Sequence, residues 1–545
     1  MGEWTIGAVL DAIADVVPDR LMTVCGNRQS TFAESADRTR RLANFLAHNG
    51  FGAHQERDAL RNWECGQDRV ALVMHNDLYV DVAVGCLKAR TVPVNVNYNY
   101  TSREVRELLE YIKPRAIVYH RQFGAKLADA LPESAELLIA VDDGSASAEL
   151  PESIGLDEAL ARGDADQAIT PSPDDVMMIC TGGTTGRPKG VMWRQCDTYV
   201  VSMSGADHES AAEIHQKVTN AGPPWLALSP LMHAAGMWTA FSAVLNGQTV
   251  VLYGSTKFDA RTALQLAERE KVGMMTMVGD AYAAPLVEEL GRHPYDLSTL
   301  FAIGTGGAAT NPKHQRALLK YLPQLTIING YGSSETGNVG FGHSQIDTQR
   351  DTFEMRDGAL VTSEDRTRFL EPGEPESGWV VRAGRIPLGY FDDAVATEKT
   401  FPEIGAKRVV VSGDRGTLAE DGTLRLHGRD SLVVNTGGEK VFVEEVEEVL
   451  RAHPGVVDAL VVGRPSERWG QEVVALVALK GDAHLTNVLL HDHCTSSLAR
   501  FKAPKEFIVV EQIRRLGNGK ADYRWAGSRV LQPDASSPTA TPRTT

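Results

Sequence analysis

The segment at residues 181–190 combines a glycine-rich turn with hydroxyl groups and two cations. It reads Thr181-Gly182-Gly183-Thr184-Thr185-Gly186-Arg187-Pro188-Lys189-Gly190 and follows an apolar run at 176–180. Glycines let backbone N–H groups turn inward without side-chain obstruction, and successive inward N–H groups form a concave anion site. The pattern predicts a polyphosphate-binding loop at the end of a strand. The alternative, a surface turn of small residues, is less consistent with this density of donors.

The loop differs from a Walker A motif, which needs Gly-Lys-Ser/Thr at the start of a helix. Here Lys189 follows Pro188 and precedes Gly190. Pro188 also disfavours helical geometry at Arg187. The sequence therefore indicates a phosphate loop of another kind.

A second polar segment follows a predicted strand at residues 325–329. It reads Asn329-Gly330-Tyr331-Gly332-Ser333-Ser334-Glu335-Thr336. It places the carboxylate of Glu335 among hydroxyl side chains at the end of a strand, where ligands of parallel sheets lie. The alternative is a turn at a strand end with a solvated Glu335.

These two segments, and further ones in the same order, resemble the acyl-adenylate-forming (ANL) enzymes, which include acyl-CoA synthetases, peptide-synthetase adenylation domains and beetle luciferases. The resemblance spans most of the chain. It implies that a carboxylate attacks the α-phosphorus of ATP to give acyl-AMP and pyrophosphate, and that coenzyme A then displaces AMP. Because the first step brings two anions together, the site needs cations, a metal and N–H donors.

The resemblance assigns a nucleotide site to several loops. It implies that Tyr331 stacks on adenine, that Ser334 contacts the α-phosphate and that Glu335 helps to hold Mg²⁺. Asp414, in Ser412-Gly413-Asp414, would bind the ribose, since a carboxylate offers two acceptor oxygens to vicinal hydroxyls. The remaining implied nucleotide-binding residues are Thr181, Gly182, Gly183, Thr184, Thr185, Gly186, Lys189, Gly307, Ala308, Ala309, Asn329, Gly330, Gly332, Ser333 and Arg429.

Other segments resemble the acyl and thiol sites of the family. His233 could steer the substrate carboxylate, although a packed histidine near a helix start is an equal alternative. Gly437 and Gly438, with Lys440, resemble the wall of the passage for the pantetheine arm; an ordinary glycine turn is the alternative. Lys520, in Gly517-Asn518-Gly519-Lys520, resembles the catalytic lysine, whereas most lysines are simply solvated at the surface.

The expected pivot of the small domain departs from the family pattern. The family, which rotates this domain between its two half-reactions, commonly has Lys or Asp at the pivot, and this chain has Ser431 followed by Leu432. We expect thioester formation to survive, while efficient adenylation is less secure. An enzyme limited to thioester formation, one that loads a carrier protein, and a non-catalytic nucleotide-binding protein are the alternatives.

Three segments most resemble actinobacterial fatty-acid and steroid-side-chain CoA ligases, which favours a bulky polycyclic, terpenoid or fatty acid over acetate. They are Gly190-Val191-Met192-Trp193-Arg194, Gly332-Ser333-Ser334-Glu335-Thr336-Gly337 and Asn435-Thr436-Gly437-Gly438-Glu439-Lys440-Val441.

Strand and helix patterns alternate through residue 329, which predicts an α/β fold of parallel sheets covered by helices. In such sheets ligands lie at the carboxyl ends of the strands, where the polar segments fall. Capping boxes at Thr31/Glu34 and Thr101/Glu104 predict helix starts. The polar segment 52–67 reads as an inserted loop, and 343–378 reads as charged and irregular. We expect a large domain at 1–430 with a β-rich subdomain, a small mobile α+β domain at 431–531, and a disordered tail at 532–545.

Composition limits the class of partner. The 545 residues carry a formal net charge of -16 without a basic cluster, which argues against nucleic acid. No apolar run reaches membrane-spanning length, and the N-terminus lacks the pattern of a secretory signal. The six cysteines form no CxxC pair, so we expect reduced thiols and a cytoplasmic protein. The oligomeric state stays open, with a homodimer as one expectation.

Overall fold

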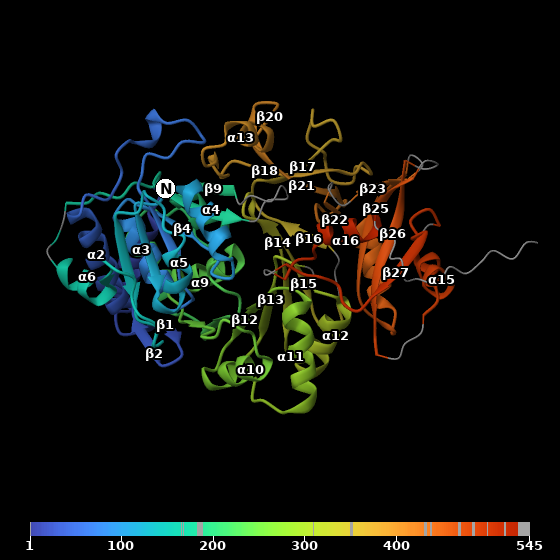
Figure 1. Ribbon diagram of the computed structural model, residues 1–545, viewed down its shortest axis with the longest axis horizontal. Coiled ribbons are helices and arrows are strands. Elements are labelled where there is room, and N and C mark those ends of the chain that lie inside the picture. Colours follow the sequence, from blue (N-terminus) through green and yellow to red (C-terminus); the bar gives the residue numbers. More distant parts are fainter. Residues whose placement is uncertain are drawn as a thin grey trace, which may run out of the picture.

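The computed structural model describes residues 2–164, 166, 168–181, 189–308, 310–348, 352–429, 433–436, 439–466, 470–481, 485–498, 500–516 and 519–531. Within this part of the chain, strands form three sheets flanked by helices, and Figure 1 shows them in a row from the N-terminal to the C-terminal part. The large N-terminal domain and small C-terminal domain of the expected α/β fold are confirmed.

The first sheet has eight strands and is parallel in its interior. Its parallel strands run in the order β8-β4-β3-β5-β6-β7, and the antiparallel strands β9 and β19 extend one edge. The strands are β3 (Arg69–Val73), β4 (Val92–Asn95), β5 (Ala116–His120), β6 (Leu137–Val141), β7 (Ile154–Gly155), β8 (Val176–Thr181), β9 (Lys189–Arg194) and β19 (Gly389–Tyr390).

Helices around this sheet start where the sequence predicts. The side chains of Thr31 and Glu34 form a complete capping box before α2, and those of Thr101 and Glu104 form one before α4. The helices of this region are α1 (Ile6–Val16), α2 (Phe32–His48), η1 (Arg57–Ala59), α3 (Tyr79–Lys88), α4 (Ser102–Ile112), η2 (Arg121–Phe123), α5 (Gly124–Ala128), α6 (Leu156–Arg162), α7 (Gln195–Ser202), α8 (Ala211–Val218) and α9 (Ala234–Val244).

The second sheet changes from parallel to antiparallel at the hairpin between β14 and β15. Its parallel strands run in the order β14-β13-β12-β10-β11-β1, and apolar residues on one of their faces pack against α10, α11 and α12. These elements are β1 (Leu21–Cys25), β2 (Arg28–Thr31), β10 (Trp225–Ala227), β11 (Val250–Leu252), α10 (Ala260–Arg269), β12 (Met274–Met277), α11 (Asp280–Arg292), β13 (Ala302–Thr305), α12 (Pro312–Tyr321) and β14 (Thr326–Ser333).

The expectation that residues 343–378 are irregular is wrong in part, because this region contributes antiparallel strands. Glycines make the close pairing possible: a Cβ at Gly340 would lie 2.8 Å from the Glu354 carbonyl oxygen, and one at Gly342 would lie 2.8 Å from that of Thr352. The β-rich part comprises β15 (Gly337–Ser344), β16 (Thr352–Met355), β17 (Ala359–Thr362), β18 (Gly378–Ala383), α13 (Ala394–Thr400), β20 (Glu403–Ile404), β21 (Lys407–Leu418) and β22 (Leu424–Arg429).

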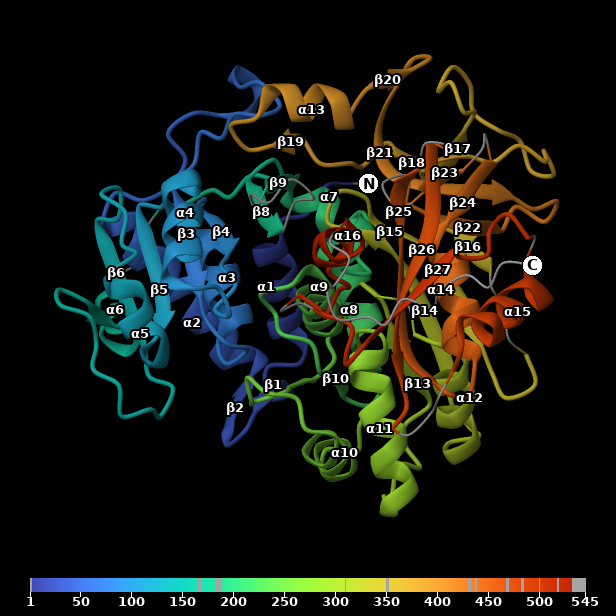
Figure 2. The same cartoon turned by 45° about the vertical axis from the view of Figure 1, so that its right-hand side comes forward.

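The small domain has its own five-stranded sheet and its own apolar core. Its elements are β23 (Val433–Thr436), β24 (Glu439–Phe442), α14 (Val443–Ala452), β25 (Val456–Ser466), β26 (Gly470–Leu479), α15 (Asn487–Ser497), β27 (Glu506–Val510) and α16 (Tyr523–Leu531). Figure 2 shows this sheet from a second side. The exact boundary at 430/431 and the tail at 532–545 lie outside the described residues and stay predictions.

Two further sequence-based expectations concern cysteines and membranes. All six cysteines are free thiols. Among the described helices, none combines the length and apolar character needed to cross a bilayer.

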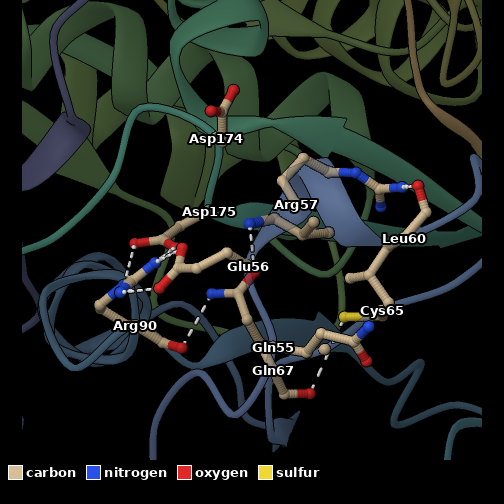
Figure 3. A pocket seen from close by; sticks show the side chains of 11 residues that line it. Gln55, Glu56, Arg57, Leu60, Cys65, Gln67, Arg90, Asp174 and Asp175 are labelled. Atoms are coloured by element: carbon tan, nitrogen blue, oxygen red, sulfur yellow. Dashed lines mark hydrogen bonds and ion pairs between the residues drawn. The ribbon is translucent and has the colours of Figure 1, made fainter.

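The inserted segment 52–67 lines a small pocket at the amino-terminal end of β8, which is the end opposite Thr181 (Figure 3). The Arg90 guanidinium pairs with Glu56 at 2.7 Å and with Asp175 at 3.0 Å. Arg57 donates to the Glu64 carbonyl oxygen at 2.8 Å. These charges are paired with neighbouring groups, and their contacts hold the inserted segment against the sheet.

Two buried histidines make the stability of the fold dependent on pH. The side chains of His75 and His120 are almost fully buried, and the backbone N–H of His75 donates to His120 Nδ1 at 2.9 Å. Burial lowers the pKa of each to about 4, from an ordinary value of 6.5. Between these values the unfolded chain binds more protons, so the free energy of unfolding falls as the pH falls from 6.5 to 4.

We therefore expect His120→Asn to reduce the loss of unfolding free energy between pH 7 and pH 4.5 by about 2 kcal/mol, because asparagine keeps an acceptor for the backbone N–H of His75 but does not titrate. Urea unfolding at pH 7 and pH 4.5 measures the difference. The exposed His343→Asn is the control. An equal slope in the His120 variant and the wild type would contradict the assignment.

Candidate active site

The predicted phosphate loop connects two antiparallel strands, β8 and β9, and begins at the carboxyl end of β8. Thr181 pairs with Lys189 across this hairpin. Asn95 fixes the end of β8: its side chain accepts from the Cys180 N–H at 2.8 Å and donates to the Met232 carbonyl oxygen at 2.7 Å. The loop is therefore held beside the segment that carries His233. Gly182, Gly183, Thr184, Thr185 and Gly186 lie outside the described residues.

Tyr390 of β19 contacts both Lys189 and Glu335. The Lys189 ammonium lies 4.6 Å from the centre of the Tyr390 ring, and the Tyr390 hydroxyl donates to Glu335 Oε1 at 3.0 Å. Burial and the neighbouring Glu335 charge raise the pKa of Tyr390, so its hydroxyl stays a donor. The structure thus brings a cation of the first sequence segment to the carboxylate of the second.

Glu335 lies in the tight turn that joins β14 to β15. The Ser333 N–H donates to the Thr336 hydroxyl at 2.9 Å, and the Trp193 indole N–H donates to the Ser334 carbonyl oxygen at 2.8 Å. A Cβ at Gly332 would lie 2.1 Å from the Gly337 carbonyl oxygen, so only glycine fits there. The turn is held rigidly against β9, which begins with Lys189.

Tyr331 and Asp414 form a direct contact between β14 and β21. The Tyr331 hydroxyl donates to Asp414 Oδ2 at 2.7 Å, and Asp414 is buried. Asp414 follows Gly413, whose φ of +79° favours glycine, and its backbone pairs with that of Arg429. The residues expected at adenine and ribose are therefore neighbours. Nothing is described of the Arg429 side chain.

Residues at the carboxyl end of β13 lie between Tyr331 and the segment that follows His233. Asn329 pairs with Thr305 of β13, and a Cβ at Gly306 would lie 3.2 Å from the Gly330 carbonyl oxygen. A Cβ at Gly307 would lie 3.9 Å from that of Ala235, at the start of α9. Gly307 and the adjacent Ala308 therefore lie between the two predicted sites, whereas Ala309 is outside the described residues.

His233 precedes α9 and lies within reach of the charge of Lys520. Burial and then this charge lower the pKa of His233 to about 4, so its imidazole is neutral at neutral pH. Lys520 is exposed at the end of a turn in which the Leu516 N–H donates to the Lys520 carbonyl oxygen at 2.8 Å. The turn before Lys520 lies against the first turn of α11, since a Cβ at Gly519 would lie 3.9 Å from the Ala281 Cβ, and the Lys520 charge reaches the predicted carboxylate-steering histidine.

The thiol passage and the pivot are two further sites that the sequence predicts. Gly437 and Gly438 lie between β23 and β24, and Ser431 and Leu432 precede β23, all outside the described residues. The same holds for the side chain of Lys440. Their roles stay predictions.

The donor set around Glu335 fits a magnesium ion carried in by a nucleotide. Among the described residues, the group that brings three potential metal ligands together is Glu3, Cys196 and Asp197. Its carboxylates are already paired with Arg194 and Arg385. Glu335 instead offers a single carboxylate beside the predicted phosphate loop, and Mg²⁺ commonly takes one or two carboxylates plus phosphate oxygens and water.

We expect Asp414→Asn to weaken ATP binding about tenfold, because hydrogen bonds to a charged acceptor are worth more than those to a neutral one, by about 1.4 kcal/mol. Isothermal titration calorimetry with ATP measures the change. The exposed Glu420→Gln, beyond the end of the same strand, is the control. Equal affinities for the Asp414 variant and the wild type would remove Asp414 from the nucleotide site.

Tyr390, Trp193 and Asn95 organise the site but are absent from the sequence-based assignment of roles. Tyr390 lies more than fifty residues from Glu335 and about two hundred from Lys189. The side chains of Trp193 and Asn95 donate to backbone carbonyl oxygens, those of Ser334 and Met232 respectively. The segment Gly389-Tyr390-Phe391 carries no local signal that indicates a partner for Tyr390.

Comparisons with known proteins extend over nearly the whole chain. The family model for the AMP-binding enzyme matches residues 10–363, and that for the AMP-binding enzyme C-terminal domain matches residues 445–520. The medium-chain acyl-CoA ligase Mig of Mycobacterium avium is 40% identical over 542 residues, which cover 97% of this chain and 98% of the relative. The 3-oxocholest-4-en-26-oate–CoA ligase of Rhodococcus rhodochrous is 32% identical, with 97% and 96% covered.

Solved structures agree on the fold. The o-succinylbenzoate CoA synthetase MenE of Bacillus subtilis, in complex with the acyl-adenylate intermediate OSB-AMP, has a TM-score of 0.76 at 22% identity over 98% of this chain and 99% of that one. ATP-bound MatB of Rhodopseudomonas palustris has a TM-score of 0.77 at 21% identity, with 96% and 99% covered.

Proposed function

This chain belongs to the AMP-binding enzyme family and is an AMP-forming acid:CoA ligase, and we propose that its acid is a medium- or long-chain fatty acid or a bulky polycyclic acid such as a steroid side-chain acid. The observation that carries the proposal is a series of neighbouring residues along one edge of the second sheet: Gly307 lies next to Ala235, two residues after His233, and Tyr331 donates to Asp414. Glu335, Tyr390 and Lys189 continue this series.

In the first half-reaction, Tyr331 and Asp414 bind the adenosine, and the segment that ends at Lys189 binds the phosphates. His233, neutral at working pH, orients the carboxylate beside the α-phosphorus. Lys520 offsets the negative charge that builds up as the two anions meet, which is the principal requirement of such a transfer. Glu335 would hold Mg²⁺, which supplies further charge neutralisation when bound with the nucleotide.

In the second half-reaction, the thiol of coenzyme A attacks the acyl carbon, the carbon–oxygen bond to AMP breaks, and AMP leaves. We propose that Gly437, Gly438 and Lys440 border the thiol passage. We also propose that the small domain, beginning near Ser431, changes orientation between the two steps.

We place the acyl group along one face of β12, near the start of α9, which follows His233. Met274, Thr276 and Val278 project from the same face of β12 and its end, and all three are only half-buried although the strand is central in its sheet. A Cβ at Gly307 would lie 3.7 Å from Val278, and one at Gly304 would lie 3.1 Å from Thr276. From residue 278 to 274 this face runs about 13 Å along the strand, which suits a long acyl group.

A panel of acids tests the proposal. The wild-type enzyme with ATP, Mg²⁺ and coenzyme A should convert medium- and long-chain or polycyclic acids to acyl-AMP and acyl-CoA, scored separately by mass spectrometry. Acetate should give neither product. Equal efficiency with acetate and with a long-chain acid would overturn the acid class.

Restriction to thioester formation is a second candidate, motivated by Ser431. The effect of the Lys520 charge on His233 favours the full reaction instead. Equal activity from acid plus ATP and from preformed acyl-AMP would reject the restriction. Loading of a carrier protein, a homodimer and a cytoplasmic location stay predictions from the sequence.

A further inference from the structure

The small domain meets the large domain at the amino-terminal end of α11. A Cβ at Gly519 would lie 3.9 Å from the Ala281 Cβ, which places the turn before Lys520 on the first turn of that helix. A second contact lies at β22, where the His427 ring is 5.7 Å from the Phe442 ring at the start of the small domain. The position of Lys520 therefore depends on how the domain rests on α11.

Asp280 begins α11 and is held in a fixed orientation. Its Oδ1 accepts from the Asn311 N–H at 2.9 Å and contacts His314 Nδ1 at 2.7 Å. Burial opposes ionisation of Asp280, but these hydrogen bonds and the charges of His314 and Arg451 hold its pKa below the usual value. Asp280 is thus an ionised partner of His314 and directly precedes Ala281, on which the turn of the small domain rests.

Arg451, in the last turn of α14, carries the opposite charge from the small domain. Its Nη1 donates to the Ala459 carbonyl oxygen at 3.1 Å and lies 3.3 Å from Glu447 Oε2. Asp280 is among the carboxylates whose charges act on this guanidinium. The Arg451 side chain is mostly buried.

Arg451 is also connected to the turn that carries Lys520. Arg451 lies 3.9 Å from Asp458, and Asp458 pairs with Arg515 at 2.5 Å. Arg515 in turn donates to the Gly519 carbonyl oxygen at 3.2 Å. A charge on α11 that attracts Arg451 therefore acts on the same rigid unit that presents Lys520.

We propose that Asp280 is a positioning residue that docks the small domain: through Arg451 it favours the orientation in which Gly519 rests on Ala281 and Lys520 faces His233. The inference rests on the proposed function, since it assigns Asp280 to the adenylation half-reaction. Asp280 touches no reacting atom, and thioester formation from preformed acyl-AMP does not require this orientation.

The first experiment separates the two half-reactions. Asp280→Asn removes the charge and keeps the acceptor for Asn311. Acyl-AMP formation should fall about 3- to 10-fold at low salt, and by less at 0.5 M salt because ions screen the wild-type attraction. Acyl-CoA formation from preformed acyl-AMP should change less than about twofold. Glu288→Gln, an exposed acid on the same helix paired with Arg292, is the matched control.

The second experiment needs no catalysis. Cysteines introduced as Ala281→Cys and Gly519→Cys have a Cβ separation suited to a disulfide. Because Gly519 has a φ of +78°, the strain of its replacement is common to all variants, and the ratio of disulfide-formation rates between variants in the full-length protein reports docking. Adding Asp280→Asn should slow this rate 3- to 10-fold, and adding Glu288→Gln should not. Single-cysteine variants control for the native thiols.

Three outcomes distinguish the inference from the proposed function. An unchanged disulfide rate with Asp280→Asn or an equal loss in both half-reactions would each overturn the docking role. A slower disulfide in a protein whose wild type forms no acyl-AMP would support docking and reject the proposed function.

Discussion

Replacing Lys520 with alanine is expected to slow single-turnover formation of acyl-AMP by about 10²–10³-fold, the usual effect of removing a group that stabilises developing charge. The reason is geometric as well as chemical: the Lys520 charge already acts on His233. Rapid quench with radiolabelled ATP and a saturating long-chain acid measures the rate. Formation of acyl-CoA from preformed acyl-AMP should be retained, because that step does not join two anions.

Lys505→Ala is the matched control, since Lys505 is an exposed lysine of the same domain at the start of β27. It should leave both half-reactions unchanged. A normal adenylation rate in the Lys520 variant would remove this residue from the mechanism.

Replacing Glu335 with glutamine is expected to lower adenylation by about 10²-fold and to raise the Mg²⁺ concentration needed for half-maximal ATP binding. Glutamine keeps the size of the side chain and an acceptor for the Tyr390 hydroxyl, so the change removes the charge. Calorimetry of nucleotide binding at a fixed ATP concentration and at increasing Mg²⁺ concentrations measures this effect separately from turnover.

Tyr390→Phe provides the comparison for Glu335, because it removes the hydroxyl that donates to Glu335 and leaves the carboxylate charge in place. Loss of one hydrogen bond is worth about 0.5–1.5 kcal/mol, so its effect should be about tenfold or less. If the Glu335 variant binds Mg²⁺ and ATP as the wild type does, the metal role of Glu335 is wrong.

The alternation of strands and helices is readable in the sequence because local signals mark it. Capping boxes at Thr31 and Thr101 fix helix starts, and apolar residues such as Val92 and Val94 mark buried strands. The strands after residue 343 escape detection because glycines and charged residues interrupt their apolar pattern. Gly340 and Gly342 look like loop residues, but the close approach of β16 requires them.

Motifs in the sequence identify the candidate site residues, but they do not show which of these residues contact one another in the fold. Asp414 and Tyr331 are both assigned to the nucleotide from the sequence, but their hydrogen bond depends on strands that no local pattern pairs. Tyr390 joins two motifs through the fold alone. The docking of the small domain on Asp280 likewise depends on long-range charge, which leaves no periodic signal in the chain.

The most direct test of the central claim, that the acid attacks the α-phosphorus of ATP, is the fate of carboxylate oxygen. A long-chain acid labelled with ¹⁸O in both oxygens is incubated with the enzyme, ATP, Mg²⁺ and coenzyme A, and the products are analysed by mass spectrometry. Attack at the α-phosphorus followed by cleavage of the acyl carbon–oxygen bond leaves one ¹⁸O in AMP. Unlabelled AMP, with ¹⁸O in pyrophosphate or phosphate, would contradict the account.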